Sequence, residues 1–199
     1  MKSSQPLSKE TKLYQVAERQ DGYFTSSQAQ QAGYTRPLLG HHVKAGRFLR
    51  VKHGIYRLVQ FPESPRADLW VAFLQLKGRG VLSHETALAL YELTDLLPSA
   101  IHLTIPPQLS RRHAGLRLHT NRLARHETIQ RDGFVITTVE RTLADVITNG
   151  IADQDARLAI SQTLARGMVT QAALTRYAKK RGGRMAQLVA AVLSENVVK

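Results

Sequence analysis

Residues 35–57 read TRPLLGHHVKAGRFLRVKHGIYR, and this stretch contains a helix signal followed directly by a hairpin signal. Thr35 is a suitable N-cap, and Pro37 fits the first turn of a helix because that turn needs no N–H from it. A helix is therefore predicted from about residue 36 to about residue 45. The pair His53-Gly54 predicts the turn of a β-hairpin, since glycine accepts a positive φ.

Two further helices are predicted upstream of this stretch. The first opens near Ser8 and ends before Gly22, and the second is capped by Thr25 or Ser26 and ends at Gly33. Three helices followed by a basic hairpin predict a winged helix-turn-helix over residues 9–60. In such a module the third helix lies in the major groove, and the hairpin is a wing that reaches phosphates or the minor groove.

The hairpin is expected to begin with a half-buried strand. Leu49 and Val51 alternate there with Arg50 and Lys52, which is the pattern of a strand with one apolar face. The wing would therefore carry its bases on the solvent side.

The charge of the chain indicates a polyanionic partner. Its 199 residues contain 28 Lys and Arg against 15 Asp and Glu, a net charge of +13. The excess is clustered, because residues 36–57, 111–125 and 166–184 hold six, five and six bases and no acid. Such fields attract DNA, and counterion release supplies affinity. Either downstream cluster could instead contact an acidic protein, and the sequence leaves this open.

Specific residues are predicted to contact DNA. The third helix would read bases through Thr35, Arg36, His41 and Lys44. The wing and its surroundings would hold phosphates through Arg47, Arg50, Lys52, His53 and Arg57. A possible additional basic surface consists of Arg111, Arg112, Arg117, Arg122 and Arg125. His41 and His42 cannot both face one base, because neighbouring helical residues point about 100° apart.

The rest of the chain predicts a second domain of mixed α/β type, so that the fold class is α+β. A linker at residues 63–65 leads into this domain, which spans residues 66–199 and ends in helices, while residues 1–8 are expected to be flexible. The predicted strands are Ile101–Ile105 and its partners Leu116–His119 and Gly133–Thr137. Helices are predicted at residues 66–77, 84–93, from 139, and at 153–166, 170–180 and 184–195.

This second domain is not expected to catalyse a reaction. Ser83, His84 and Glu85 are adjacent, but consecutive helical residues fan around the axis and do not converge as a catalytic triad must. A capping role for Ser83 and a helix-dipole role for Glu85 explain these residues. Arg141 and Asp145, one turn apart, predict a structural ion pair, or alternatively a group that orients a partner-binding surface.

No cofactor or metal site is predicted. The eight histidines come without cysteine or a spaced pair of helical ligands. The chain also has no apolar run of roughly 18 residues and no hydrophobic segment at its N-terminus. A cytoplasmic protein that does not enter membranes is therefore expected.

Four segments together resemble the AbiE-type (AbiEi) antitoxins. They are residues 21–29 with Gly33, residues 49–58, residues 81–90, which are similar to the family's SHxSA helix start, and residues 137–145, which are similar to its TxPERTLxD segment with Val139 in the place of proline. The resemblance spans roughly residues 12–150. It implies the antitoxin of a type IV toxin–antitoxin system, which represses its own operon through promoter inverted repeats. It also implies that the protein counters a neighbouring nucleotidyltransferase-like toxin, often without a stable complex.

Three alternatives stay open. The N-terminal module could bind a toxin directly, or the chain could be a general winged-helix regulator unrelated to a toxin. Related regulators with a fused nuclease domain suggest a nucleic-acid-processing enzyme, although the acids here are scattered. On DNA, the protein is expected to act as a weak dimer or as cooperating monomers.

Overall fold

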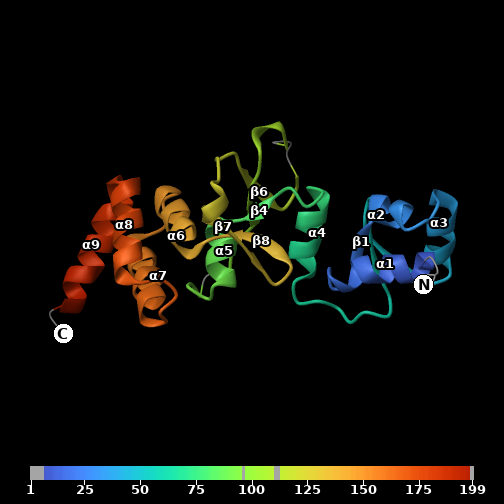
Figure 1. The fold of residues 1–199 in the computed structure, drawn as a ribbon, viewed down its shortest axis with the longest axis horizontal. Coiled ribbons are helices and arrows are strands. Elements are labelled where there is room, and N and C mark those ends of the chain that lie inside the picture. The colour runs from blue at the N-terminus through green and yellow to red at the C-terminus, as the bar shows by residue number, and fades with distance from the viewer. Residues whose placement is uncertain (1–6, 96, 110–112, 198–199) are drawn as a thin grey trace, which may run out of the picture. The chain divides into compact units, whose positions relative to one another are not determined.

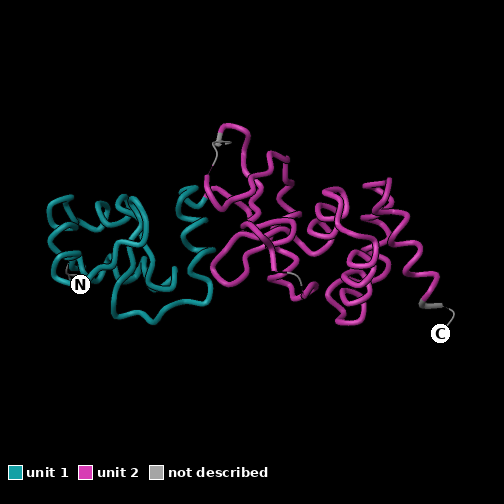
Figure 2. Tube along the Cα trace, turned by 180° about the vertical axis from the view of Figure 1, so that it is seen from behind, with its two compact units in different colours: residues 1–78 teal, residues 79–199 magenta. Residues whose placement is uncertain are grey.

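A computed structural model describes residues 7–95, 97–109 and 113–197, and the chain divides into two compact units, residues 1–78 and 79–199 (Figure 2). Most of the expected flexible N-terminus, residues 1–8, lies outside the described residues. None of the described helices is long and apolar enough to cross a membrane.

The first unit is a winged helix followed by one more helix (Figure 1). Its elements are α1 (Lys9–Glu18), β1 (Tyr23–Thr25), α2 (Ser26–Gln31), α3 (Arg36–Lys44), β2 (Phe48–Lys52), β3 (Ile55–Leu58) and α4 (Ala67–Gln75). The strands form an antiparallel sheet in the order β1-β3-β2. The predicted helices and hairpin are thus present, and β1 is a strand that was not predicted.

The helix α4 corrects the predicted domain boundary. Residues 66–77 are predicted to open the C-terminal domain, whereas in the structure they belong to the N-terminal unit. The reason is packing, because α4 contacts β1 and β3. A proline-containing linker before a helix does not by itself show whether that helix packs on the domain before the linker or on the domain after it.

Side-chain caps fix the starts of the three helices of the module. Ser8 accepts from the Thr11 N–H at the start of α1, and Thr35 accepts from the Leu38 N–H at the start of α3. Thr25 forms a capping box with α2. A core then holds the helices against the sheet; its large members are Leu13, Phe24, Tyr34, Leu39, Phe48 and Leu58. Full burial of such a side chain contributes roughly 1.5–3 kcal/mol.

The second unit contains a five-stranded mixed sheet and helices. Its elements are β4 (Val81–Leu82), α5 (His84–Leu90), β5 (Ile101–Thr104), β6 (Leu116–His119), β7 (Thr128–Arg131), β8 (Phe134–Thr137), α6 (Val139–Thr148), α7 (Asp153–Ala165), α8 (Gln171–Arg181) and α9 (Gly183–Val197), with short 3-10 turns at Pro107–Leu109 and Arg125–Glu127. The strand order is β6-β5-β4-β8-β7. The predicted pairing of β5 with β6 is present and parallel. The predicted pairing of β5 with β8 is wrong, because the two-residue strand β4 lies between them.

Helix α6 connects the sheet-bearing part of this unit with its C-terminal helices. It packs against α5 on one side and against α7, α8 and α9 on the other (Figure 1). The predicted ion pair between Arg141 and Asp145 is present at 2.8 Å, and Glu127 joins it at 2.9 Å from Arg141. All three side chains are buried, so the pair is part of the interior of this unit.

Candidate nucleic-acid interface

Helix α3 has one buried face and one exposed, basic face. Leu39 and His42 point into the core. The exposed positions Arg36, Gly40 and Lys44 follow one another at four-residue spacing, and His41 is exposed as well. Because helical residues four apart share a face, these positions form one stripe that starts at the N-terminus of the helix. The predicted base-reading residues of α3 are therefore accessible together.

The two adjacent histidines of α3 have different environments. The ring of His42 stacks on Phe48 with a centroid separation of 4.7 Å and meets Tyr34 edge-on. Burial lowers the pKa of His42, and the nearby charge of Arg47 adds to this. His42 is thus a neutral core residue, and His41 is the one that is available to a ligand.

The wing is formed by β2 and β3. Its turn lies at His53-Gly54, where Gly54 has a φ of 72°, as predicted. The N–H of Ser26 donates to the Gly54 carbonyl, which ties the tip to the start of α2. Arg50 and His53 contact each other at 3.1 Å between Nη2 and Nδ1, and both are exposed. The tip therefore presents preordered polar side chains beside the module's helices.

The predicted half-buried strand at the start of the wing is wrong in one respect. Only Phe48 of β2 is buried, while Leu49 and Val51 are 48% and 39% exposed. The hairpin extends beyond the core, so its apolar positions have nothing in this unit to cover them. Apolar side chains on a wing are compatible with insertion into a minor groove.

Arg57 differs from the other predicted phosphate contacts. It lies on β3, the central strand of the sheet, and is half-buried. Its Nη1 donates to the Phe61 carbonyl at 3.1 Å. Arg47 and Lys52, by contrast, are exposed at the two ends of the segment that leads to the tip.

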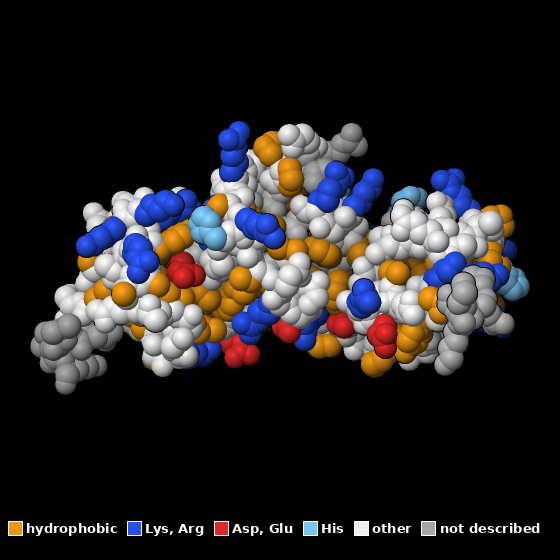
Figure 3. All heavy atoms as spheres, viewed as in Figure 1, with side chains coloured by type: hydrophobic (Ala, Val, Ile, Leu, Met, Phe, Trp, Pro, Cys, Tyr) orange, Lys and Arg blue, Asp and Glu red, His pale blue; other side chains and the backbone are white. Residues whose placement is uncertain are grey.

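The bases of this surface are not neutralised. Within residues 7–78, no carboxylate forms an ion pair with Arg36, Lys44, Arg47, Arg50 or Lys52. Figure 3 shows Lys, Arg and His side chains on the visible face of this unit, at the right of the view. Cations that have no internal partner are available for phosphates, which is what an electrostatic DNA interface requires.

The additional basic surface is described only in part. Arg111 and Arg112 lie outside the described residues. Arg117, Arg122 and Arg125 are exposed in the second unit, around β6 and the loop that follows it.

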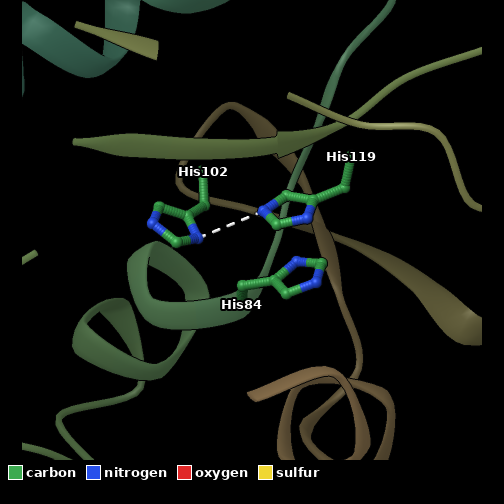
Figure 4. A group of neighbouring side chains, drawn as sticks. All are labelled: His84, His102 and His119. Atoms are coloured by element: carbon green, nitrogen blue, oxygen red, sulfur yellow. Dashed lines mark hydrogen bonds between the residues drawn. The ribbon is translucent and has the colours of Figure 1, made fainter. Parts of the chain in front are cut away.

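The structure also brings together three histidines that were not predicted to lie near one another. His84 begins α5, His102 lies in β5, and His119 ends β6 (Figure 4). One ring nitrogen of each lies within 4.8 Å of the others. The prediction that no group of residues has the geometry of a metal site is therefore wrong. The sequence did not indicate this group, because residues 84, 102 and 119 come together only through the pairing of β5 with β6 and the position of α5.

The environment of these histidines keeps their rings uncharged. Burial is the main cause that lowers the pKa of His84 to about 3, and His119 and His102 add to it. Burial likewise lowers the pKa values of His102 and His119 to about 4. All three are neutral imidazoles at pH 7.

Ser83 has a role other than the predicted one. It stands at the N-cap position of α5, but its side chain makes no capping hydrogen bond. Its hydroxyl instead accepts from Thr104 at 2.8 Å and contacts Nδ1 of His84 at 2.9 Å. Ser83 thus orients the histidine ring, and because it is fully buried it is not accessible as a nucleophile.

A cleft of about 760 Å³ adjoins the histidines in the second unit. His84 and His119 line it together with Arg122, Arg141, Asp145, Arg181 and Arg184, among others. Its charged lining is predominantly basic, so the cleft favours water and anions over apolar ligands.

Comparison with known proteins concerns the N-terminal module. Residues 12–59 match the family model described as "Transcriptional regulator, AbiEi antitoxin". This span runs from α1 through the wing and includes all nine predicted DNA-contacting residues of the module, so the resemblance to this family is confirmed there. The similar segments at residues 81–90 and 137–145 lie outside the matched span. No curated protein matches the chain.

Proposed function

We propose, from the premise that residues 12–59 form an AbiEi antitoxin regulator module, that this chain is a sequence-specific DNA-binding repressor and the antitoxin of a type IV toxin–antitoxin system. The observation that carries the proposal is the exposed stripe of α3, whose bases have no acidic partner and which lies next to a basic wing. A module that packed only against neutral protein surfaces would not need this uncompensated charge.

The proposed mechanism divides base reading from phosphate binding. Helix α3 enters the major groove with Thr35, Arg36, His41 and Lys44 toward the base edges. Arg36, in the first turn, is placed to donate two hydrogen bonds to a guanine. The phosphate contacts are made by Arg47, Arg50, Lys52 and His53. Arg57 contributes less, because its guanidinium already donates a hydrogen bond to the Phe61 carbonyl.

The proposed biological role follows the family resemblance. Two copies of the module would occupy an inverted repeat in the protein's own promoter, as a weak dimer or as cooperating monomers. Half-sites would then lie about one helical turn, roughly 34–36 Å, apart or a multiple of it. Repression in the cytoplasm and neutralisation of a nucleotidyltransferase-like toxin would both proceed without catalysis by this chain.

The test compares three alanine variants on promoter DNA and on scrambled DNA. Arg36→Ala should lose about 1–3 kcal/mol of discrimination at one base position. Lys52→Ala should weaken binding to both DNAs alike and reduce the salt slope by about 1. Arg19→Ala is the matched control, because Arg19 is exposed at the C-terminal end of α1, near the sheet end opposite the wing tip.

An Arg36→Ala variant with unchanged sequence preference would contradict the placement of α3 in the groove. Equal losses in Arg19→Ala and Lys52→Ala would show that only net charge matters. Co-purification of a stoichiometric protein partner at high salt, together with unspecific DNA binding, would favour the direct toxin-binding alternative.

A further inference from the structure

We propose that His84, His102 and His119 bind one divalent transition-metal ion of the zinc class. The three rings come from three elements of the second unit and converge on one point beside the basic cleft (Figure 4). The inference does not depend on DNA binding, since the N-terminal module contributes nothing to this cluster.

The donor atoms fit this class of ion. Imidazole nitrogens suit zinc, cobalt, nickel and copper, whereas magnesium and calcium require oxygen ligands. Histidine ligates in its neutral form, which is the form that the buried cluster maintains at pH 7. Two of the three rings, those of His84 and His102, are 3% and 0% exposed. These two side chains are therefore shielded from bulk solvent.

The contacts around His102 are those of a metal ligand with an outer carboxylate. Its Nδ1 faces Nε2 of His119 at 3.2 Å, inside the cluster. Its other nitrogen, Nε2, is buried without a hydrogen-bond partner and lies 3.6 Å from a carboxylate oxygen of Glu85. When Nδ1 binds a metal, Nε2 carries the proton and points it toward Glu85, the outer-shell arrangement common to metal-bound histidines.

Metal binding requires a small closure of the cluster and the rotation of one ring. A tetrahedral ion with Zn–N bonds of about 2.0–2.1 Å holds its nitrogens roughly 3.4 Å apart. The ring nitrogens here lie within 4.8 Å of one another, so any pair must approach by at most about 1.4 Å. The rings of His84 and His119 are stacked at 3.5 Å, so one of them turns about its side-chain bonds to aim its nitrogen at the ion.

The backbone and the cleft support the same site. His84 has a φ of 53°, a left-handed conformation that is uncommon for a non-glycine residue. This conformation places its ring beside His119, and strain of this kind concentrates at functional positions. His84 and His119 line the cleft, which gives an ion an entry path and leaves a fourth coordination position open to water.

The experiment uses the full chain without an affinity tag, because a histidine tag binds the same metals. The protein is freed of metal with a chelator, transferred to chelator-free buffer and titrated with Co²⁺, whose visible absorption reports tetrahedral coordination. Elemental analysis after gel filtration gives the stoichiometry for Zn²⁺. The wild-type chain should bind one equivalent of either metal, and Zn²⁺ should raise its Tm.

Two glutamine variants separate the cluster from other histidines. His119→Gln removes the most exposed of the three ligands, and it should lower Co²⁺ affinity at least about 100-fold. This loss is larger than the roughly 10–100-fold that follows when a residue contacting a ligand, and not the ligand itself, is replaced. His126→Gln is the control, because His126 is exposed in the same unit and lies outside the cluster. It should bind one equivalent as the wild type does. Circular dichroism and Tm in chelator verify that both variants are folded.

The proposal is overturned if the wild-type chain binds no Co²⁺ or if His119→Gln binds it with wild-type affinity. The first result would make the histidines a neutral polar core held by Ser83 and Glu85. If His119→Gln is unfolded, Glu85→Gln tests the same site from its outer shell. It should keep one equivalent of metal and bind it about 10–100-fold more weakly, and an unchanged affinity would contradict the assigned geometry.

Discussion

Replacement of Arg141 by methionine should destabilise the second unit by about 3 kcal/mol. Arg141 is 3% exposed and donates to Asp145 at 2.8 Å, to Glu127 at 2.9 Å and to the Arg122 carbonyl at 3.3 Å. Removal of one partner from a buried ion pair costs about 3–5 kcal/mol, because the remaining charge is left uncompensated. The lower end applies here, since Arg181 stays 3.7 Å from Asp145.

The change should be local. Glu127 keeps hydrogen bonds from the Ala124 N–H and the Tyr177 hydroxyl, so it is Asp145 that loses most of its compensation. Urea unfolding followed by circular dichroism gives the free energy of unfolding. Hydrogen exchange read by mass spectrometry should show lost protection in peptides of α6 and unchanged protection in peptides of α3.

The matched control is Arg157→Met. Arg157 pairs with Glu195, and both side chains are exposed, at 39% and 64%. An exposed pair contributes about 0–1 kcal/mol. If Arg141→Met loses no more stability than Arg157→Met, the reasoning that treats the Arg141 cluster as a buried, mutually dependent group is refuted.

Three further predictions concern stability and protonation. Gly22→Ala should destabilise the first unit by about 2–4 kcal/mol in urea unfolding, since φ is 88° there and a Cβ would lie 2.5 Å from that of Phe61. His42→Phe should leave stability and DNA affinity within about 1 kcal/mol of wild type, because Nδ1 of His42 has no partner to lose; a larger loss in either assay would show an undetected polar role. With chelator present, stability should be constant above about pH 6.5 and fall as the pH decreases toward 4. His84, His102 and His119 have lowered pKa values in the folded chain, so the unfolded chain binds more protons in this range, and stability changes by about 1.4 kcal/mol per pH unit for each proton by which the two states differ. A flat pH profile of urea midpoints from 6.5 to 4.5 would contradict this.

Local chemistry made the N-terminal module predictable. The first helix begins next to Ser8 as predicted, Thr25, one of the two predicted candidates, caps the second helix, Thr35 caps the third, and His53-Gly54 forms the turn. Each of these signals acts within a few residues of its position, so no tertiary information is needed to use it. The strands β1, β4 and β7 were not predicted. β1 and β4 have three and two residues, which are too few for a period to show, and β7 has a single apolar residue, Ile129, and so no alternating pattern.

The remaining features depend on contacts between distant segments. His42 is buried and Leu49 is exposed because of where the core of the module ends. A local sequence pattern carries no information about that boundary. The histidine cluster requires the register of β5 on β6 and the position of α5. A usable signal was present: His102 stands within a predicted strand, and His119 ends its predicted partner. The predicted pairing of those strands already places the two histidines near each other, and only the approach of His84 depends on the position of α5.

The most direct test of the central claim is fluorescence anisotropy with the protein's own promoter fragment and a scrambled fragment across a range of salt concentrations. The account predicts a preference for the promoter of about a thousandfold or more that persists at physiological salt. Equal binding to both fragments that disappears as salt rises would contradict it, and would leave the basic module with electrostatic attraction alone.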